Sequence, residues 1–241
     1  MADALAKGKK PETTGTGRRS GEDVFVETTT RAWKWVHENL TTFILLVAGL
    51  GLVVLGSLYY VNFRASVREQ AATALATLRL SAAAPEAIIP ELEAHIERFE
   101  GTESADEARI VLGRLYLNGG QPDQAIRALE AVGAPANHPV GYAARSLLAS
   151  AQEASGNGEA ALATWQALGR SARFGFQRRQ ASAEAARILA ESGRLDEAAA
   201  ILTRIAEEAE DDPSEAGVYR IRLGEINARI RAESADGGSP D

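Results

Sequence analysis

The sequence predicts an all-α fold in which one transmembrane helix precedes a solenoid of helical hairpins, and two observations support this prediction. Residues 43–63 form a run of 21 residues without a charged side chain. After this run, a spaced pattern of glycine, alanine and large apolar residues recurs three times. An uncharged run of this length is stable only in a bilayer or a deep core, and the recurring pattern is typical of stacked helical repeats.

The uncharged run has the length and the flanking residues of a complete membrane crossing. At about 1.5 Å per residue it reaches roughly 31 Å, which matches the hydrocarbon thickness of a bilayer. Aromatic rings, which prefer the headgroup region, stand at both ends: Trp33, Trp35, Tyr59, Tyr60 and Phe63. A cleaved signal peptide is the alternative, but its apolar core is shorter and follows a short basic segment, whereas 42 residues precede this run. An uncleaved anchor is therefore the favoured interpretation.

The rest of the chain divides around this segment. We expect residues 1–42 to form a largely disordered cytoplasmic tail, with a short interfacial helix from Val24, because the first part has almost no large apolar side chain. Residues 64–232 are expected to form the helical repeat domain, and residues 233–241 a disordered tail. Seven basic residues in the amino-terminal tail favour a cytoplasmic amino terminus. The carboxy-terminal domain would then lie in the periplasm of a bacterium with two membranes.

Within the predicted span, Gly49 and Gly56 are seven residues apart and share one helical face. Small residues of this kind let another helix approach closely, although glycine also occurs in spans that serve only as passive anchors. No ionisable residue lies between residues 43 and 63. The span is therefore not expected to be an ion or proton pathway.

Two helices are expected between the span and the repeats. Strong helix formers follow Arg64 and should continue the helix toward Pro85, which stops it. From Glu86 to Glu100 the apolar residues fall on one face, with His95 beside them, as in an amphipathic helix. Gly101 is expected to end this second helix.

The repeats align on a glycine that is followed five residues later by an alanine, at intervals of 36 and 37 residues: Gly120 and Ala125, Gly156 and Ala161, Gly193 and Ala198. Four residues after each alanine stands a large side chain, and twelve before it a small residue: Leu129, Trp165 and Leu202, and Gly113, Ala149 and Ala186. Small residues let two antiparallel helices approach to about 8–10 Å, and the glycine allows the turn between them. Each helical hairpin would be stable only when stacked on a neighbour.

These positions resemble the tetratricopeptide repeat over about residues 105–212. Leu112, Gly113, Tyr116, Ala125, Leu129 and Val132 fit the family pattern, whereas Gln152 and Leu189 replace the tyrosine in the second and third units. A partial fourth unit at Arg222-Leu-Gly224 predicts a capping helix that ends near Ala232. The resemblance implies a concave groove lined by the first helix of each pair, at Arg114, Asn118, Ser146, Ser150, Arg187 and Glu191. A solvated helix surface is the alternative for each of these residues.

Residues 170–179, between the second and third repeats, concentrate arginine and phenylalanine: Arg170, Arg173, Phe174, Phe176, Arg178 and Arg179. The favoured interpretation is that both phenylalanines pack under a longer loop. An acidic protein partner or a lipid headgroup is the alternative. Nucleic acid is not expected as a partner, because the chain has a net charge of −7 and an acidic domain repels phosphate backbones.

Nothing in the sequence indicates a catalytic, metal or cofactor site. The chain has no cysteine, and its three histidines, His37, His95 and His138, lie in separate segments without metal-ligand spacing. Residues 156–161 satisfy the GxGxxA pattern, but dinucleotide binding needs a preceding strand, and a helix is predicted there. An enzyme or sensor would need a cluster of ionisable residues, so we expect neither catalytic activity nor a cofactor.

A short cytoplasmic tail, one span and a periplasmic tetratricopeptide-like domain are similar to the layout of the ancillary subunits of the bacterial Sec translocon. The resemblance implies an inner-membrane scaffold with a chaperone-like role. Its partners would be translocon subunits, chaperones or secreted clients. The alternative is a structural accessory subunit of another envelope complex, in outer-membrane assembly or division.

Overall fold

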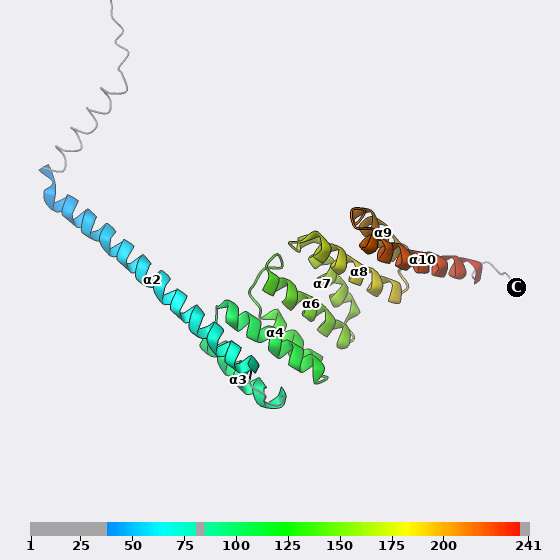
Figure 1. Ribbon diagram of the computed structural model, residues 1–241, viewed down its shortest axis with the longest axis horizontal. Helices are drawn as coiled ribbons and strands as arrows, with labels where there is room; N and C mark the ends of the chain where they lie inside the picture. Colours follow the sequence, from blue (N-terminus) through cyan, green and yellow to red (C-terminus); the bar gives the residue numbers. More distant parts are fainter. Residues whose placement is uncertain (1–37, 81–84, 237–241) are drawn as a thin grey trace, which may run out of the picture. The chain divides into compact units, whose positions relative to one another are not determined.

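A computed structural model of the chain describes residues 38–80 and 85–236 (Figure 1). The predicted disordered tail and interfacial helix fall on residues that lie outside this description. Within it, the regular elements are all α-helices, which confirms the all-α prediction. They are α2 (Leu40–Leu80), α3 (Pro85–Arg98), α4 (Glu103–Asn118), α5 (Pro122–Glu130), α6 (Pro139–Ala154), α7 (Gly158–Ser171), α8 (Gly175–Glu191), α9 (Leu195–Glu208) and α10 (Pro213–Asp236).

The chain divides into two compact units, Met1–Asn62 and Phe63–Asp241. The described part of the first unit is the amino-terminal part of α2, where apolar side chains face outward. Leu45, Leu52 and Tyr59 are 67%, 72% and 75% exposed. No part of the apolar window of α2 is buried, and the helix is long and apolar enough to cross a membrane. By its length and composition, this helix is a candidate membrane span.

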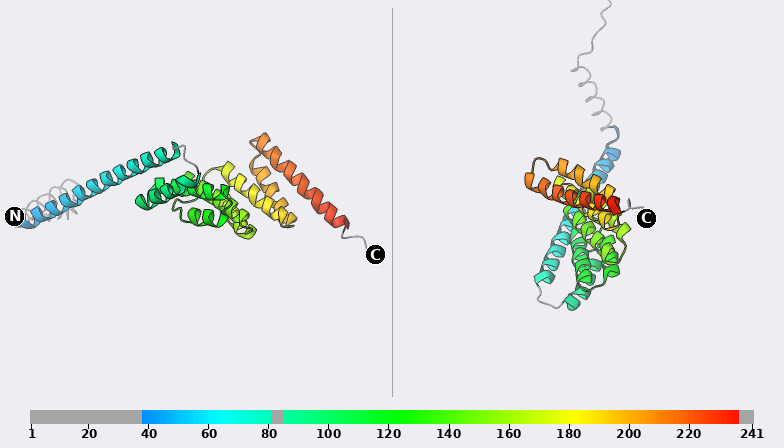
Figure 2. Two further views of the ribbon diagram at one scale, coloured as in Figure 1. Left: turned by 90° about the horizontal axis from the view of Figure 1, so that it is seen from below. Right: turned by 90° about the vertical axis from the view of Figure 1, so that its right-hand side faces the viewer.

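The second unit is an array of helical hairpins. The pairs α4/α5, α6/α7 and α8/α9 follow one another, and Figure 1 shows α4, α6 and α8 side by side and running in the same direction. The carboxy-terminal part of α2 and the whole of α3 pack against α4 at one end of the array. At the other end of the array, α10 packs on α9 (Figure 2). The two helices predicted before the repeats are confirmed as the carboxy-terminal part of α2 and as α3.

The turn inside each repeat is made by the glycine that the spacing predicted. Gly120, Gly156 and Gly193 have φ values of 69°, 81° and 81°. This left-handed conformation costs energy for any residue with a Cβ atom, so glycine lets the chain reverse directly after the first helix of each pair. The alanines five residues later, Ala125, Ala161 and Ala198, are completely buried. The predicted hairpin spacing is therefore confirmed in all three repeats.

The last helix is longer than expected. We predicted a capping helix ending near Ala232, but α10 continues to Asp236, so residues 233–236 are helical rather than part of a disordered tail. Strong helix formers such as Ala232 and Glu233 extend the helix beyond its last apolar contact at Ile230. Residues 237–241 lie outside the described part of the chain.

Candidate interaction surfaces

The residues predicted to line the groove lie on α4, α6 and α8, the first helices of the three pairs. Arg114 and Asn118 are exposed on α4. Ser146 and Ser150, on α6, use their hydroxyl groups to donate to backbone oxygens one turn earlier, those of Tyr142 and Ser146. The two serines are thus already hydrogen-bonded within their own helix, while the two α4 side chains face solvent. Binding of a partner at these positions stays a prediction.

Arg187, a further predicted groove residue, holds α8 against α6. Its guanidinium group contacts Glu153 of α6 at 2.6 Å, and Glu184 and Glu191 of its own helix at 2.9 and 3.0 Å. Burial by itself would lower the pKa of Arg187, but the hydrogen bonds to the three glutamates outweigh it and raise the pKa above its ordinary value. Arg187 and Glu191, two of the predicted groove residues, therefore belong to one charge network that also contains Glu153 and Glu184.

A cavity of about 310 Å³ lies beside this network, between α8, α9 and α10. Small side chains of α8, Ala183, Ala186 and Ala190, form one wall. The other wall belongs to α10 and carries Arg222, Glu225 and Arg229. Arg229 donates to the backbone oxygen of Ala190 at 3.0 Å. Sequence reasoning treated α10 only as a cap, because nothing in its local pattern shows that its charged residues line a cavity with α8.

Residues 170–179 do not form the longer loop that we expected. Helix α7 extends to Ser171 and α8 begins at Gly175, so residues 172–174 alone connect them. The prediction that both phenylalanines pack beneath a loop is wrong: Phe174 is 44% and Phe176 56% exposed. The two rings stack on each other with their centroids 5.7 Å apart. The connection is too short to cover them.

The four arginines of this segment have different surroundings. Arg179 forms a two-contact ion pair with Glu215 of α10, and Glu215 also accepts from the hydroxyl of Tyr219. Hydrogen bonding by Arg179 lowers the pKa of the Glu215 carboxyl, whereas burial first, and then the hydrogen bond to Glu215, raise the pKa of Tyr219 to about 12. Arg179 therefore ties the start of α8 to α10 and is not available to a partner.

Arg170, Arg173 and Arg178 make no ion pair within the part of the chain that the structure describes. The Arg173 guanidinium lies 5.3 Å from the centre of the Phe174 ring, and Arg178 donates to the backbone oxygens of Ala172 and Arg173. Carbonyl groups do not neutralise a guanidinium charge. We call Arg170, Arg173, Phe174, Phe176 and Arg178 the Phe174 surface.

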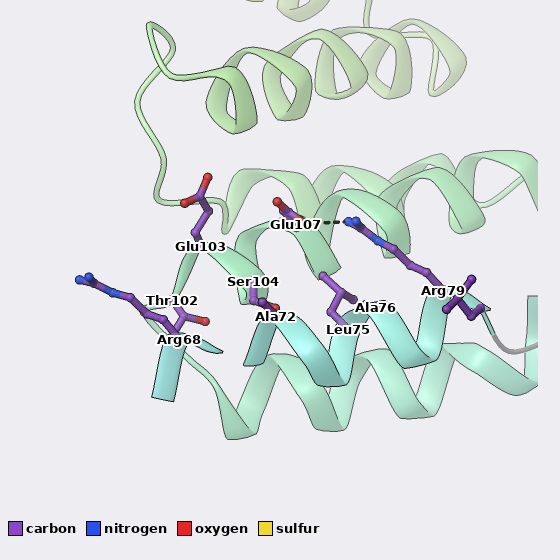
Figure 3. A pocket seen from close by; sticks show the side chains of 11 residues that line it. Arg68, Ala72, Leu75, Ala76, Arg79, Thr102, Glu103, Ser104 and Glu107 are labelled. Carbon is purple, nitrogen blue, oxygen red and sulfur yellow. Dashed lines mark hydrogen bonds and ion pairs between the residues drawn. The ribbon is translucent and has the colours of Figure 1, made fainter. Parts of the chain in front are cut away.

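A pocket of about 690 Å³ lies between the carboxy-terminal part of α2 and the start of α4 (Figure 3). Figure 3 shows Arg68 and Arg79 extending from α2, and Glu103 and Glu107 from α4. Arg79 and Glu107 form an ion pair at 2.9 Å. The pocket thus presents both signs of charge around the apolar Ala72, Leu75 and Ala76. Sequence reasoning missed it, because it exists only where α2 packs on α4.

Beneath this pocket, a buried hydrogen-bond chain joins three helices. Ser104 of α4 donates to the backbone oxygen of Ala71 in α2 at 2.9 Å, and His95 of α3 lies 3.0 Å from the Ser104 hydroxyl. Since the hydroxyl proton of Ser104 is used toward Ala71, Nε2 of His95 donates to Ser104. Burial first, and then the Arg98 charge, lower the pKa of His95. His95 is thus a structural residue that the amphipathic pattern placed correctly beside the apolar face of α3.

The two glycines singled out in the predicted span have open surroundings. A Cβ atom at Gly49 or Gly56 would meet no atom within 4 Å. Helix packing at these positions therefore stays a prediction. Among residues 38–80 and 85–236, no three His, Asp or Glu side chains are grouped closely enough to hold a metal ion.

Comparison with known proteins identifies the family. No curated protein sequence matches the chain. Among solved structures, the nearly identical TPR-like repeats from Podosopora anserina, described as those of a kinesin light chain, align with a TM-score of 0.47 at 20% sequence identity, covering 73% of this chain and 96% of that chain. A single-residue variant of the same protein gives a TM-score of 0.47 at 20% identity, covering 71% and 94%. The family profile described as the tetratricopeptide repeat-like domain matches residues 33–178, well over half of the sequence. The chain therefore belongs to the tetratricopeptide repeat-like domain family.

Proposed function

We propose that this protein is a membrane-anchored scaffold of the bacterial inner membrane that binds protein partners during protein translocation. TPR-like domains generally mediate protein–protein interactions, which supports a scaffold role for the helical array. The observation that carries the proposal is that this array follows, in the same helix α2, an apolar window in which no residue is buried. A chain of this kind holds an interaction domain beside a bilayer.

Membrane anchoring is the first part of the proposal, and it rests on residues 43–63. Leucine and valine side chains are exposed along this part of α2, and their contact with lipid tails is more favourable than their contact with water. Replacing Leu50 and Val53 by arginine should cost about 5–7 kcal/mol of insertion free energy, because each charge at the centre of a span costs about 2.5–3.5 kcal/mol. We expect the parent protein to remain in the membrane pellet after alkaline extraction and this variant to be released.

Ala200, an exposed residue on α9, supplies the matched control. The Ala200→Arg variant adds a charge outside the span and should remain in the pellet. Release of the parent protein at alkaline pH would disprove anchoring.

The second part of the proposal is the orientation, with the amino terminus in the cytoplasm and the repeat domain in the periplasm. Basic residues of the short amino-terminal segment support it, since such residues are retained on the cytoplasmic side. A reporter enzyme that is active only in the periplasm, fused after Asp241, should be active in intact cells. Activity of a cytoplasm-specific reporter at the same position would contradict the orientation.

The third part is the kind of partner. Arg114 and Asn118 are exposed on the first helix of the first repeat, where a partner in the groove would meet them. A photo-crosslinking residue at Asn118 should capture translocon subunits, chaperones or secreted proteins in intact membranes. The same residue at Ala163, exposed on a second helix of a pair, should not. Capture of division or outer-membrane assembly proteins instead would replace translocation by another envelope role while leaving the scaffold intact.

A further inference from the structure

The Phe174 surface combines two features that a soluble face of an acidic domain normally avoids. Its two phenyl rings are stacked and about half exposed, and three guanidinium groups around them have no carboxylate partner within the described residues. Isolated exposed apolar residues are common, but two rings set among uncompensated positive charges form a distinct chemical surface. The neighbouring Arg179 is neutralised by Glu215. The lack of a carboxylate partner is therefore limited to the three arginines of the Phe174 surface.

Contacts within the repeat domain place this surface on a particular edge. Residues 63–80 of α2 run parallel to α4, because Ala71 is joined to Ser104 and Arg79, further along α2, is joined to Glu107, further along α4. Glu103, also at the start of α4, lies 3.8 Å from His138, which precedes α6. The hydroxyl of Tyr142 in the first turn of α6 lies 3.4 Å from the backbone oxygen of Gln177 in α8. The starts of α4, α6 and α8 therefore form one continuous edge.

This edge is the one at which the chain enters the repeat domain. Ala71 is eight residues beyond residue 63, the last residue of the uncharged run, which corresponds to about 12 Å of helix. The opposite edge, where α4, α6 and α8 end, carries the turn glycines Gly120, Gly156 and Gly193. If residues 43–63 cross a membrane, the Phe174 surface lies on the edge to which the anchor is attached.

We propose that the Phe174 surface docks onto the anionic phospholipid surface of the same membrane. The phenyl rings would enter the headgroup region, where amphipathic and aromatic groups are favoured, and Arg170, Arg173 and Arg178 would bind lipid phosphates. Arginine suits this role because its planar guanidinium binds phosphate oxygens with two hydrogen bonds. The proposal rests on the membrane anchoring proposed above and adds a second, reversible membrane contact to it.

The size of the surface favours lipid over a protein partner. A stable protein interface uses about 20–30 residues on each side, whereas two rings and three arginines stand out here. A lipid surface needs only a few basic groups and an apolar insertion, because the anchor already holds the domain at a high local lipid concentration. Each arginine near an anionic surface contributes about 1 kcal/mol, or about a fivefold factor.

The sequence offers a clean way to test this. Because the chain has no cysteine, Ser171→Cys introduces a single thiol beside the Phe174 surface while keeping its rings and arginines. Ser155→Cys places the control thiol at the carboxy-terminal end of α6, on the opposite edge of the repeat domain. Both side chains are exposed. Each full-length variant would carry a nitroxide spin label and be reconstituted into vesicles of phosphatidylcholine alone or of an equal mixture with phosphatidylglycerol.

We expect the label at residue 171 to become shielded from a water-soluble relaxation agent and accessible to oxygen in phosphatidylglycerol vesicles, while the label at residue 155 stays in water. Replacing Arg170 and Arg173 by serine should lower the docked-to-undocked ratio by about 25-fold, a factor of about five for each arginine. Replacing Phe174 and Phe176 by serine should also abolish docking. The matched control, Arg220→Ser with Arg222→Ser, removes the same charge from exposed residues of α10 and should leave docking unchanged.

Failure of this proposal can be told apart from failure of the anchor. Vesicle flotation after an alkaline wash reports whether the chain is integrated. Suppose that the chain is integrated and that the label at residue 171 is as accessible to the water-soluble agent as the label at residue 155 in both kinds of vesicle. That result would overturn lipid docking and favour a protein partner for the surface. A chain that does not float with the vesicles would overturn both proposals. Equal docking to both kinds of vesicle would overturn the role of the arginines.

Discussion

Gly113 of α4 lies directly against Leu129 of α5, so closely that a Cβ atom on Gly113 would be 2.7 Å from the Leu129 Cγ atom. Real Cβ atoms do not approach that closely, and all three branch carbons of the leucine lie within 3.0 Å of the position. The contact closes the first hairpin of the array. Gly113 and Leu129 are also the small and large residues that the repeat pattern places twelve before and four after Ala125.

Substituting Gly113 by alanine should destabilise the repeat domain by about 1–3 kcal/mol, because the added methyl group overpacks the hairpin. Gly224→Ala is the matched control. Gly224 is also helical, but a Cβ atom there meets nothing within 4 Å, so alanine should stabilise α10 by up to about 1 kcal/mol. Thermal unfolding of the full chain in detergent, followed by circular dichroism, measures both. A stabilised Gly113→Ala protein would contradict the close contact.

Ala161→Leu should destabilise the second hairpin by a similar amount, about 1–3 kcal/mol. Ala161 is completely buried against α6, so the larger side chain has no space without displacing the helix. Ala163, on the same helix but exposed, provides the control, and leucine there should change the unfolding temperature little. If the two leucine variants unfold at the same temperature, the repeat register is wrong.

Arg187→Gln should lower stability by about 1 kcal/mol. The substitution leaves Glu153, Glu184 and Glu191 close together without their shared cation. The Arg187 side chain is 37% exposed, so solvent screens part of the interaction, and the effect should be smaller than for a buried pair. High salt should narrow the difference between parent and variant, because it screens exposed charges. A difference that does not depend on salt would indicate lost packing instead.

Arg179 and Arg173 should respond differently to the same substitution. Arg179→Ser removes the ion pair to Glu215 and should cost about 1–3 kcal/mol, because both side chains are four-fifths buried. Arg173 has no carboxylate partner among the described residues and is exposed, so Arg173→Ser should leave the unfolding temperature unchanged. The comparison by thermal unfolding separates the structural arginine from the surface one. Equal losses would show that Arg173 also holds the fold.

Stability should depend on pH through His95. Burial and Arg98 lower its pKa in the folded state below the ordinary value of 6.5, so the unfolded chain binds a proton more readily. The contribution is fully present above pH 6.5 and is lost as the pH falls through the lowered folded-state pKa. Unfolding temperatures measured from neutral to acidic pH should show this decline.

His95→Gln keeps a hydrogen-bond donor for Ser104 but cannot take up a proton. This variant should therefore lose stability less steeply than the parent as the pH falls below 6.5. Identical pH profiles for parent and variant would exclude His95 as the group responsible.

Local patterns predicted the helices, their turns and their pairing. The left-handed glycines, the buried alanines and the following large residues all came from spacing along the chain, because a helical hairpin brings together residues only 16 positions apart, such as Gly113 and Leu129. Reliance on local composition also explains the wrong prediction of a loop at residues 170–179. Its composition resembled a loop, but helix-forming residues on both sides extend α7 and α8 into it.

The sequence alone thus determined an exposed apolar helix followed by stacked helical pairs, since both depend on hydrogen bonds and periodicity within short segments. Only the tertiary structure decided which charges remain available. Arg179 is neutralised by a residue 36 positions away, and Arg187 by one 34 positions away, whereas Arg173 reaches no carboxylate in the described chain. Contacts between distant helices, and not the residue type, separate an arginine that holds the fold from one that is exposed to solvent.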